Sequence, residues 1–199
     1  MEAHTFVLVA LLPHCALAYS YGAPVHRHPN VCIRMSPGRR HGNNTATGPP
    51  PYTIAVSEMA YTPGKSFQVT IRADQGVTFS GFFIQARSQA DTSLTSALGT
   101  FMDIPHETHV LNCSSTAGAW SHSNDKDRTE VTATWMPPSE SQDTIAFQAT
   151  IVRGPKSVYW EGVKSLPLCY MPSAAPGPVF SGVFPLTFAN LLALMVGLP

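Results

Sequence analysis

The sequence contains few charged residues. Asp, Glu, Lys and Arg make up 12% of the 199 residues, and 12 basic side chains balance 12 acidic ones. Domains that bind nucleic acid or anionic membranes by electrostatic attraction carry a clear basic excess. The charge balance therefore argues against nucleic acid as a partner, and it indicates no other partner.

The chain also lacks the short motifs that identify large families of hydrolases and zinc proteins. It has no GxSxG segment, no HExxH segment and no CxxC pair. Such motifs supply the nucleophile or the metal ligands of these proteins. We therefore expect no enzymatic activity, no bound metal and no cofactor.

A sustained helical period is missing from the middle of the chain, whereas turn-forming residues are abundant. Eighteen prolines and fourteen glycines separate short apolar segments. In several of these segments apolar and polar residues alternate, as in a strand with one buried face. The pattern predicts a single all-β domain, an antiparallel sandwich of seven to nine strands. The expected strands span 52–56, 67–73, 77–87, 98–102, 108–113, 131–135, 145–151 and 158–163.

The segment 77–87, VTFSGFFIQAR, is the densest apolar run outside the termini. Its apolar residues occupy odd positions before Gly81 and even positions after it. Because side chains alternate between the two faces of a strand, we interpret this change as a β-bulge at Gly81. A core strand covered on both faces explains the same pattern equally well.

Both ends of the chain resemble processing signals. Residues 1–18 contain a short apolar run that ends in Ala16-Leu17-Ala18, which predicts a secretory signal peptide that forms a helix. The last 35 residues carry no charge. Within them, the small residues Ser173-Ala174-Ala175 are followed by a spacer and then by an apolar tail at 183–199. This order predicts a glycolipid anchor attached at Ser173, with 169–182 as a linker. A transmembrane helix and a tail without a role are the alternatives.

Secretion would place three cysteines, Cys32, Cys113 and Cys169, in an oxidising compartment. Three pairings are possible, and spacing alone does not choose between them. Asn43 and Asn112 begin N-glycosylation sequons, although Cys113 occupies the middle position of the second one.

Two groups of polar residues are candidate sites. His26, His28 and His41 could bind a metal, but exposed histidines in an irregular segment are the favoured interpretation. His122 lies between Ser121 and several acidic residues, so it has the residue types of a hydrolytic triad. A polar turn is the favoured interpretation there. For the tryptophans we favour core packing over a carbohydrate-stacking surface; they are Trp120, Trp135 and Trp160.

Several segments together resemble a reeler domain, the reelin N-terminal domain family. These segments occur in a matching order over roughly residues 22–165: Gly22-Ala23-Pro24, Met35-Ser36-Pro37-Gly38, Pro50-Pro51-Tyr52, Tyr61-Thr62-Pro63-Gly64, residues 79–87, His122-Ser123-Asn124, Trp135-Met136-Pro137-Pro138 and Trp160.

The resemblance implies an immunoglobulin-like β-sandwich at 19–168 and a disulfide between Cys32 and Cys113. It leaves Cys169 without an assigned partner. By analogy with the family, we expect a non-enzymatic module, secreted or tethered to the outer face of the plasma membrane. It would bind an extracellular protein or a microbial surface polymer, as in innate defence. The alternative is the accessory domain of a truncated ferric-chelate reductase-like membrane protein.

Overall fold

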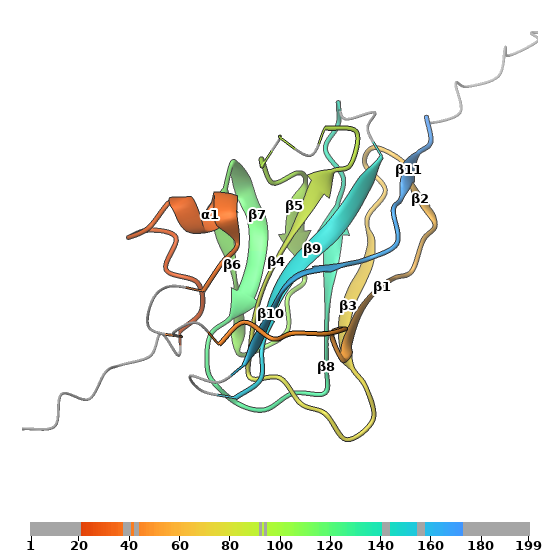
Figure 1. Cartoon of the computed structure of the whole chain (residues 1–199). Coiled ribbons are helices and arrows are strands. Elements are labelled where there is room, and N and C mark those ends of the chain that lie inside the picture. The colour runs from red at the N-terminus through yellow and green to blue at the C-terminus, as the bar shows by residue number, and fades with distance from the viewer. Residues whose placement is uncertain are drawn as a thin grey trace, which may run out of the picture.

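The structure of the chain is a computed structural model (Figure 1). It describes residues 21–37, 41, 44–91, 93, 95–140, 144–154 and 158–172. The expected signal peptide, Asn43, Ser173 and the apolar tail at 183–199 lie outside the described residues.

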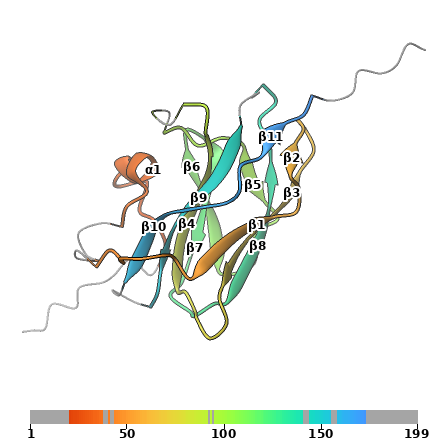
Figure 2. The same ribbon diagram turned by 45° about the vertical axis from the view of Figure 1, so that its right-hand side comes forward.

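Two antiparallel sheets face each other and enclose the core (Figures 1 and 2). This arrangement confirms the predicted all-β sandwich. The four-stranded sheet has the order β1 (Tyr52–Val56), β3 (Phe67–Ala73), β8 (Glu130–Met136) and β5 (Thr100–Met102). The five-stranded sheet has the order β10 (Tyr159–Lys164), β9 (Ile145–Val152), β4 (Gly81–Ser88), β7 (Ser115–His122) and β6 (Thr108–Cys113).

The four-stranded sheet follows the alternation of its sequence. Along β3 every second side chain is buried, from Phe67 to Ile71, while the residues between them are more exposed. β8 has the same pattern, and Trp135 at its end is fully buried. The Trp135 ring packs edge-on against Phe147 of the opposite sheet, with ring centroids 5.1 Å apart. Each strand of this sheet therefore contributes one apolar face to the core.

The bulge predicted at Gly81 is not found inside β4. β4 begins at Gly81, and its register with β9 is unbroken from Gly81, opposite Val152, to Ser88, opposite Ile145. The preceding residue of the apolar run, Phe79, instead bridges to Arg128, just before β8 of the other sheet. The apolar positions change parity because the chain crosses from one sheet to the other at this point. All eight residues of β4 are buried, as the alternative interpretation required.

Three features were not expected from the sequence. The N-terminal segment contains a short helix, α1 (Asn30–Arg34), within what we predicted to be an irregular lead-in. The segment 119–127 is not a turn throughout, because β7 continues to His122. A parallel pair of short strands, β2 (Ala60–Tyr61) and β11 (Cys169–Tyr170), closes one end of the sandwich. β11 lies within the stretch 169–182 that we expected to be a linker.

Gly81 has a structural role despite the absence of a bulge. A Cβ atom at this position would lie 3.1 Å from the His122 ring and 3.3 Å from Val152. We expect Gly81→Val to lower the free energy of unfolding by about 1 to 3 kcal/mol, because the added atoms overpack this contact. Chemical denaturation measures the change.

The matched control is Ala55→Val, which adds a similar volume at an exposed position of β1. Its effect should stay below about 0.5 kcal/mol. Equal stabilities for the two variants would show that the close approach to His122 has no energetic consequence.

Candidate functional site

An open groove of about 820 Å³ lies beside β10, between this strand and the segment that leads to β1. We call it the Trp160 groove. Its lining residues come from four separate parts of the chain: Asn44, Thr45, Ala46, Thr47, Thr78, Asp127, Arg153, Gly154, Val158 and Trp160.

One wall of the groove is fixed by backbone pairing. Thr45 forms a parallel bridge with Tyr159, at the start of β10. The amide of Ala46 donates to the carbonyl of Tyr159 at 2.8 Å, and the Tyr159 amide donates to the carbonyl of Asn44 at 3.1 Å. The Thr45 hydroxyl also donates to the Tyr159 hydroxyl. Residues 44–46 therefore pair with β10 as an additional edge strand would.

The groove combines one aromatic side chain with hydroxyl groups and two opposite charges. Trp160 packs edge-on against the core residue Tyr52, with ring centroids 5.2 Å apart. Its indole nitrogen Nε1 is buried, with no hydrogen-bond partner among the described residues. Arg153 and Asp127 are exposed at the same groove. An aromatic surface beside several donors and acceptors suits a ligand that has both apolar faces and hydroxyl groups.

His122 does not belong to a catalytic triad. Its Nδ1 atom lies 3.0 Å from both the amide nitrogen and the carbonyl oxygen of Phe82, so the ring bonds to the backbone of β4. The hydroxyl of Ser121 is buried and donates to the same carbonyl at 2.7 Å. Burial lowers the pKa of His122 to about 4, so the ring is neutral at pH 7. These contacts are structural, and they leave no accessible nucleophile at Ser121.

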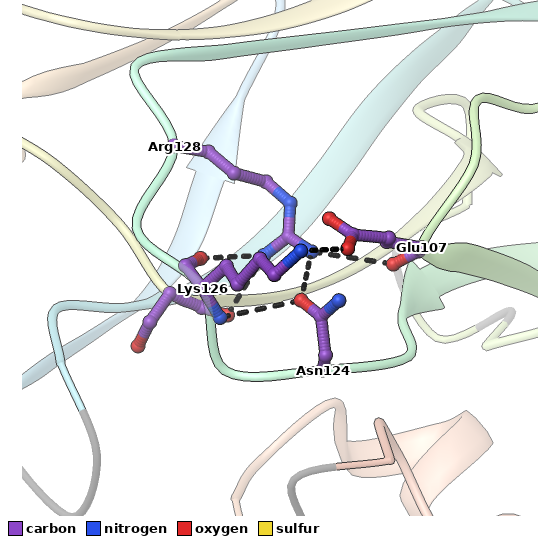
Figure 3. A network of polar contacts seen from close by, with 5 residues as sticks. Glu107, Asn124, Lys126 and Arg128 are labelled. Atoms are coloured by element: carbon purple, nitrogen blue, oxygen red, sulfur yellow. Dashed lines mark hydrogen bonds and ion pairs between the residues drawn. The ribbon is translucent and has the colours of Figure 1, made fainter.

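The polar residues that follow His122 join two loops (Figure 3). Arg128 donates to the Asn124 side chain and to the backbone carbonyls of Lys126 and Glu107. Lys126 in turn pairs with the Glu107 carboxylate. Lys126 lowers the pKa of Glu107 through this side-chain hydrogen bond. The acidic and basic residues of this motif thus fix the β7–β8 loop onto the β5–β6 loop, in agreement with a structural turn.

The predicted metal candidates are not brought together. His26 and His28 are exposed, and His41 is half-buried beside Tyr159. No cluster of metal-binding side chains occurs in the part of the chain that the structure describes. None of the described helices is long and apolar enough to cross a bilayer.

A family model for the reeler domain matches residues 30–174. The chain is also 32% identical over 170 residues to defense protein Hdd11 of Hyphantria cunea, covering 82% of this chain and 96% of that protein. This chain belongs to the reeler domain family. It is likewise similar to ferric-chelate reductase 1 of Mus musculus, 32% identical over 172 residues. That match covers 85% of this chain but only 27% of the length of the reductase.

Solved structures agree with this assignment at the level of the fold. The reelin-N domain of F-spondin superposes with a TM-score of 0.54 at 22% identity, covering 72% of this chain and 97% of that domain. The human F-spondin reeler domain gives a TM-score of 0.53 at 24% identity, covering 64% and 93%. The immunoglobulin-like sandwich that the resemblance implied is therefore confirmed.

The reeler domain contains the expected disulfide between Cys32 and Cys113, and Cys169 is a free, exposed thiol on β11. Asn112, the second predicted glycosylation site, is exposed next to this disulfide. Its side-chain oxygen accepts a hydrogen bond from the Ala117 amide, which leaves the amide nitrogen free for a glycan. Occupancy of both sequons stays a prediction.

The disulfide is one of three links that hold α1 on the outer face of the five-stranded sheet. The buried Arg87 guanidinium donates to the carbonyls of Cys32 and Ile33 and to the side chain of Gln85. Thr150 donates to the carbonyl of Met35, whose side chain is buried. Burial lowers the pKa of Arg87, but its bonds to carbonyl oxygens, favoured at a helix C-terminus, satisfy the cation.

These sites were predictable from the sequence only in part. The resemblance supplied the disulfide, and the favoured interpretation of 119–127 as a structural turn agrees with the loop that follows His122, but it did not include Arg128. Trp120 and Trp135 are fully buried, as predicted, whereas Trp160 packs on the core and also lines the groove. No sequence signal joined the four segments of the groove, because their proximity follows from the sheet order.

Removing the Arg87 cation should loosen the attachment of α1. We expect Arg87→Met to lower the free energy of unfolding by about 2 to 4 kcal/mol, because buried carbonyls lose their donor while most of the apolar volume is kept. Arg72→Met is the control, since Arg72 forms an exposed pair with Glu130 and should contribute below about 1 kcal/mol. Similar values for both variants in urea denaturation would contradict the role assigned to Arg87.

Proposed function

We propose that this reeler domain is a non-enzymatic extracellular binding module, and that the Trp160 groove receives a segment of a microbial surface polymer. The observation that carries the proposal is the composition of the groove, with one tryptophan, three threonine hydroxyls and an Arg–Asp combination along an open channel. Polysaccharides present hydroxyl groups and apolar ring faces, which match these two kinds of surface.

The rigidity of the groove supports the same proposal. The wall at 44–47 is bonded to β10, and the Trp160 ring is held by Tyr52. A preformed site loses little conformational entropy when a flexible polymer binds. The similarity to an insect defense protein over 96% of its length agrees with recognition of a microbial surface.

A second candidate function is that of an accessory domain in a ferric-chelate reductase-like membrane protein. The similarity to the mouse reductase, over 85% of this chain, favours it. In that case the groove would bind a neighbouring domain of the same protein. A longer transcript that encodes transmembrane helices after Ser165 would support this candidate.

Binding can be tested with purified secreted protein and insoluble peptidoglycan, β-glucan and lipopolysaccharide-coated beads. We expect wild-type protein to bind at least one of these polymers. Arg153→Ala and Thr47→Val, which change exposed groove residues, should weaken binding about tenfold each, because they remove polar contacts to the ligand.

Met59→Ala, at an exposed position outside the groove, is the control and should bind like the wild type. Unchanged binding of the groove variants would place the polymer elsewhere on the domain. Failure of wild-type protein to bind any of the polymers would overturn the proposed function.

Localisation can be tested separately in secretory cells. We expect surface protein that phosphatidylinositol-specific phospholipase C releases, with a mass that begins near Tyr19 and ends near Ser173. Treatment with a glycosidase should lower this mass if Asn43 and Asn112 carry glycans. Retention in the membrane after the phospholipase would contradict the glycolipid anchor, and intracellular protein would contradict secretion.

A further inference from the structure

His122 interacts electrostatically with two other histidines near the place where the N-terminal segment lies on the five-stranded sheet. His109 belongs to β6 and His122 to β7, while His41 precedes the groove wall. The charges that act on His122 come from Arg128, His109 and His41. All three groups are basic, and no carboxylate of the described residues acts on the pKa of His122. A proton added to this cluster would therefore meet other positive charges.

The first residues of the N-terminal segment rest directly on this cluster. A Cβ atom at Gly22 would lie 2.8 Å from the His109 ring and 2.2 Å from the carbonyl oxygen of His122. Gly22 also has a φ of +86°, which favours glycine. The next residue, Ala23, donates its amide to the buried Ser121 hydroxyl at 3.3 Å. The His109 ring therefore cannot move outward while this segment stays in place.

We propose that residues 21–35 form an acid-sensitive latch. At neutral pH the segment covers the histidine cluster, and acidification to about pH 5 releases its Gly22–Ala23 end from β6 and β7. The Cys32–Cys113 disulfide keeps α1 attached. This regulation is independent of the ligand of the Trp160 groove.

The direction of the effect follows from proton linkage. Burial lowers the pKa of His41, His109 and His122 below the usual value of 6.5. The closed form therefore binds fewer protons than the open form, so it is favoured above pH 6.5 and loses stability as the pH falls toward 4. Gly22 lies against the His109 ring, so opening would expose this ring and raise its pKa toward the usual value.

Opening would uncover apolar surface. Phe83 and Ala119, on the outer face of β4 and β7, are buried, and Ala23 and Val25 of the latch pack against their cluster. The released form would thus offer a new apolar surface at acidic pH.

Amide hydrogen exchange on the full chain, corrected for the intrinsic pH dependence of exchange, tests the latch. Between pH 7.5 and pH 5 we expect the protection of residues 21–30 to fall at least tenfold, while β3 and β8 keep theirs. His109→Gln removes one titrating ring and should reduce this fall at least threefold. His106→Gln changes an exposed histidine nearby and should behave like the wild type.

A constant protection of residues 21–30 across this pH range would overturn the latch. An equal loss of amide protection in β3 and β8 would also overturn the latch, since acid would then unfold the whole domain. The same holds if His109→Gln and His106→Gln give identical pH profiles. His122→Asn, whose amide can replace the contacts of Nδ1, should flatten the profile as well, and an unchanged profile would exclude His122 from the mechanism.

Discussion

Both faces of β4 are covered, one by the four-stranded sheet and the other by the N-terminal segment with α1. A strand buried on two faces can leave few polar groups unpaired, because an unpaired buried donor or acceptor costs about 1–3 kcal/mol. In β4 the side-chain nitrogen Nε2 of Gln85 is buried without a partner among the described residues. The backbone of β4 pairs with β7 and β9. Its buried Arg87 meets this requirement by donating to carbonyls of the covering segment.

The same constraint explains the polar residues around β4. Ser121 and His122 bond to the backbone of Phe82, and Thr150 bonds to the carbonyl of Met35. The contacts of Ser121 and His122 join β7 to β4, whereas the Thr150 bond and the Ala23 amide, which donates to Ser121, join the covering segment to the sheet. β-Sandwiches commonly leave such an outer face to water. Residue types that suggested a hydrolase therefore make structural contacts, and Ser121 also accepts the Ala23 amide of the covering segment.

Strands with one face exposed to solvent were predicted correctly from the sequence. β1, β3 and β8 alternate, so their pattern is visible without any knowledge of their neighbours. The prediction was incomplete for strands whose two faces are both covered. β7 consists largely of small residues whose burial depends on the covering segment, and α1 is too short to show a helical period. At Gly81 the alternation changed because the chain changes sheets, which a local pattern cannot distinguish from a bulge.

The fold class and several strand positions could be predicted from the sequence alone, because the alternation of side chains along a strand is a local property. Together with the family resemblance, the sequence also indicated the Cys32–Cys113 disulfide. The tertiary structure was needed to show which residues share the Trp160 groove and that Gly22 lies against the His109 ring and the His122 carbonyl. Those proximities join segments far apart in the chain, and they depend on sheet order and on the N-terminal segment folding back over β6 and β7.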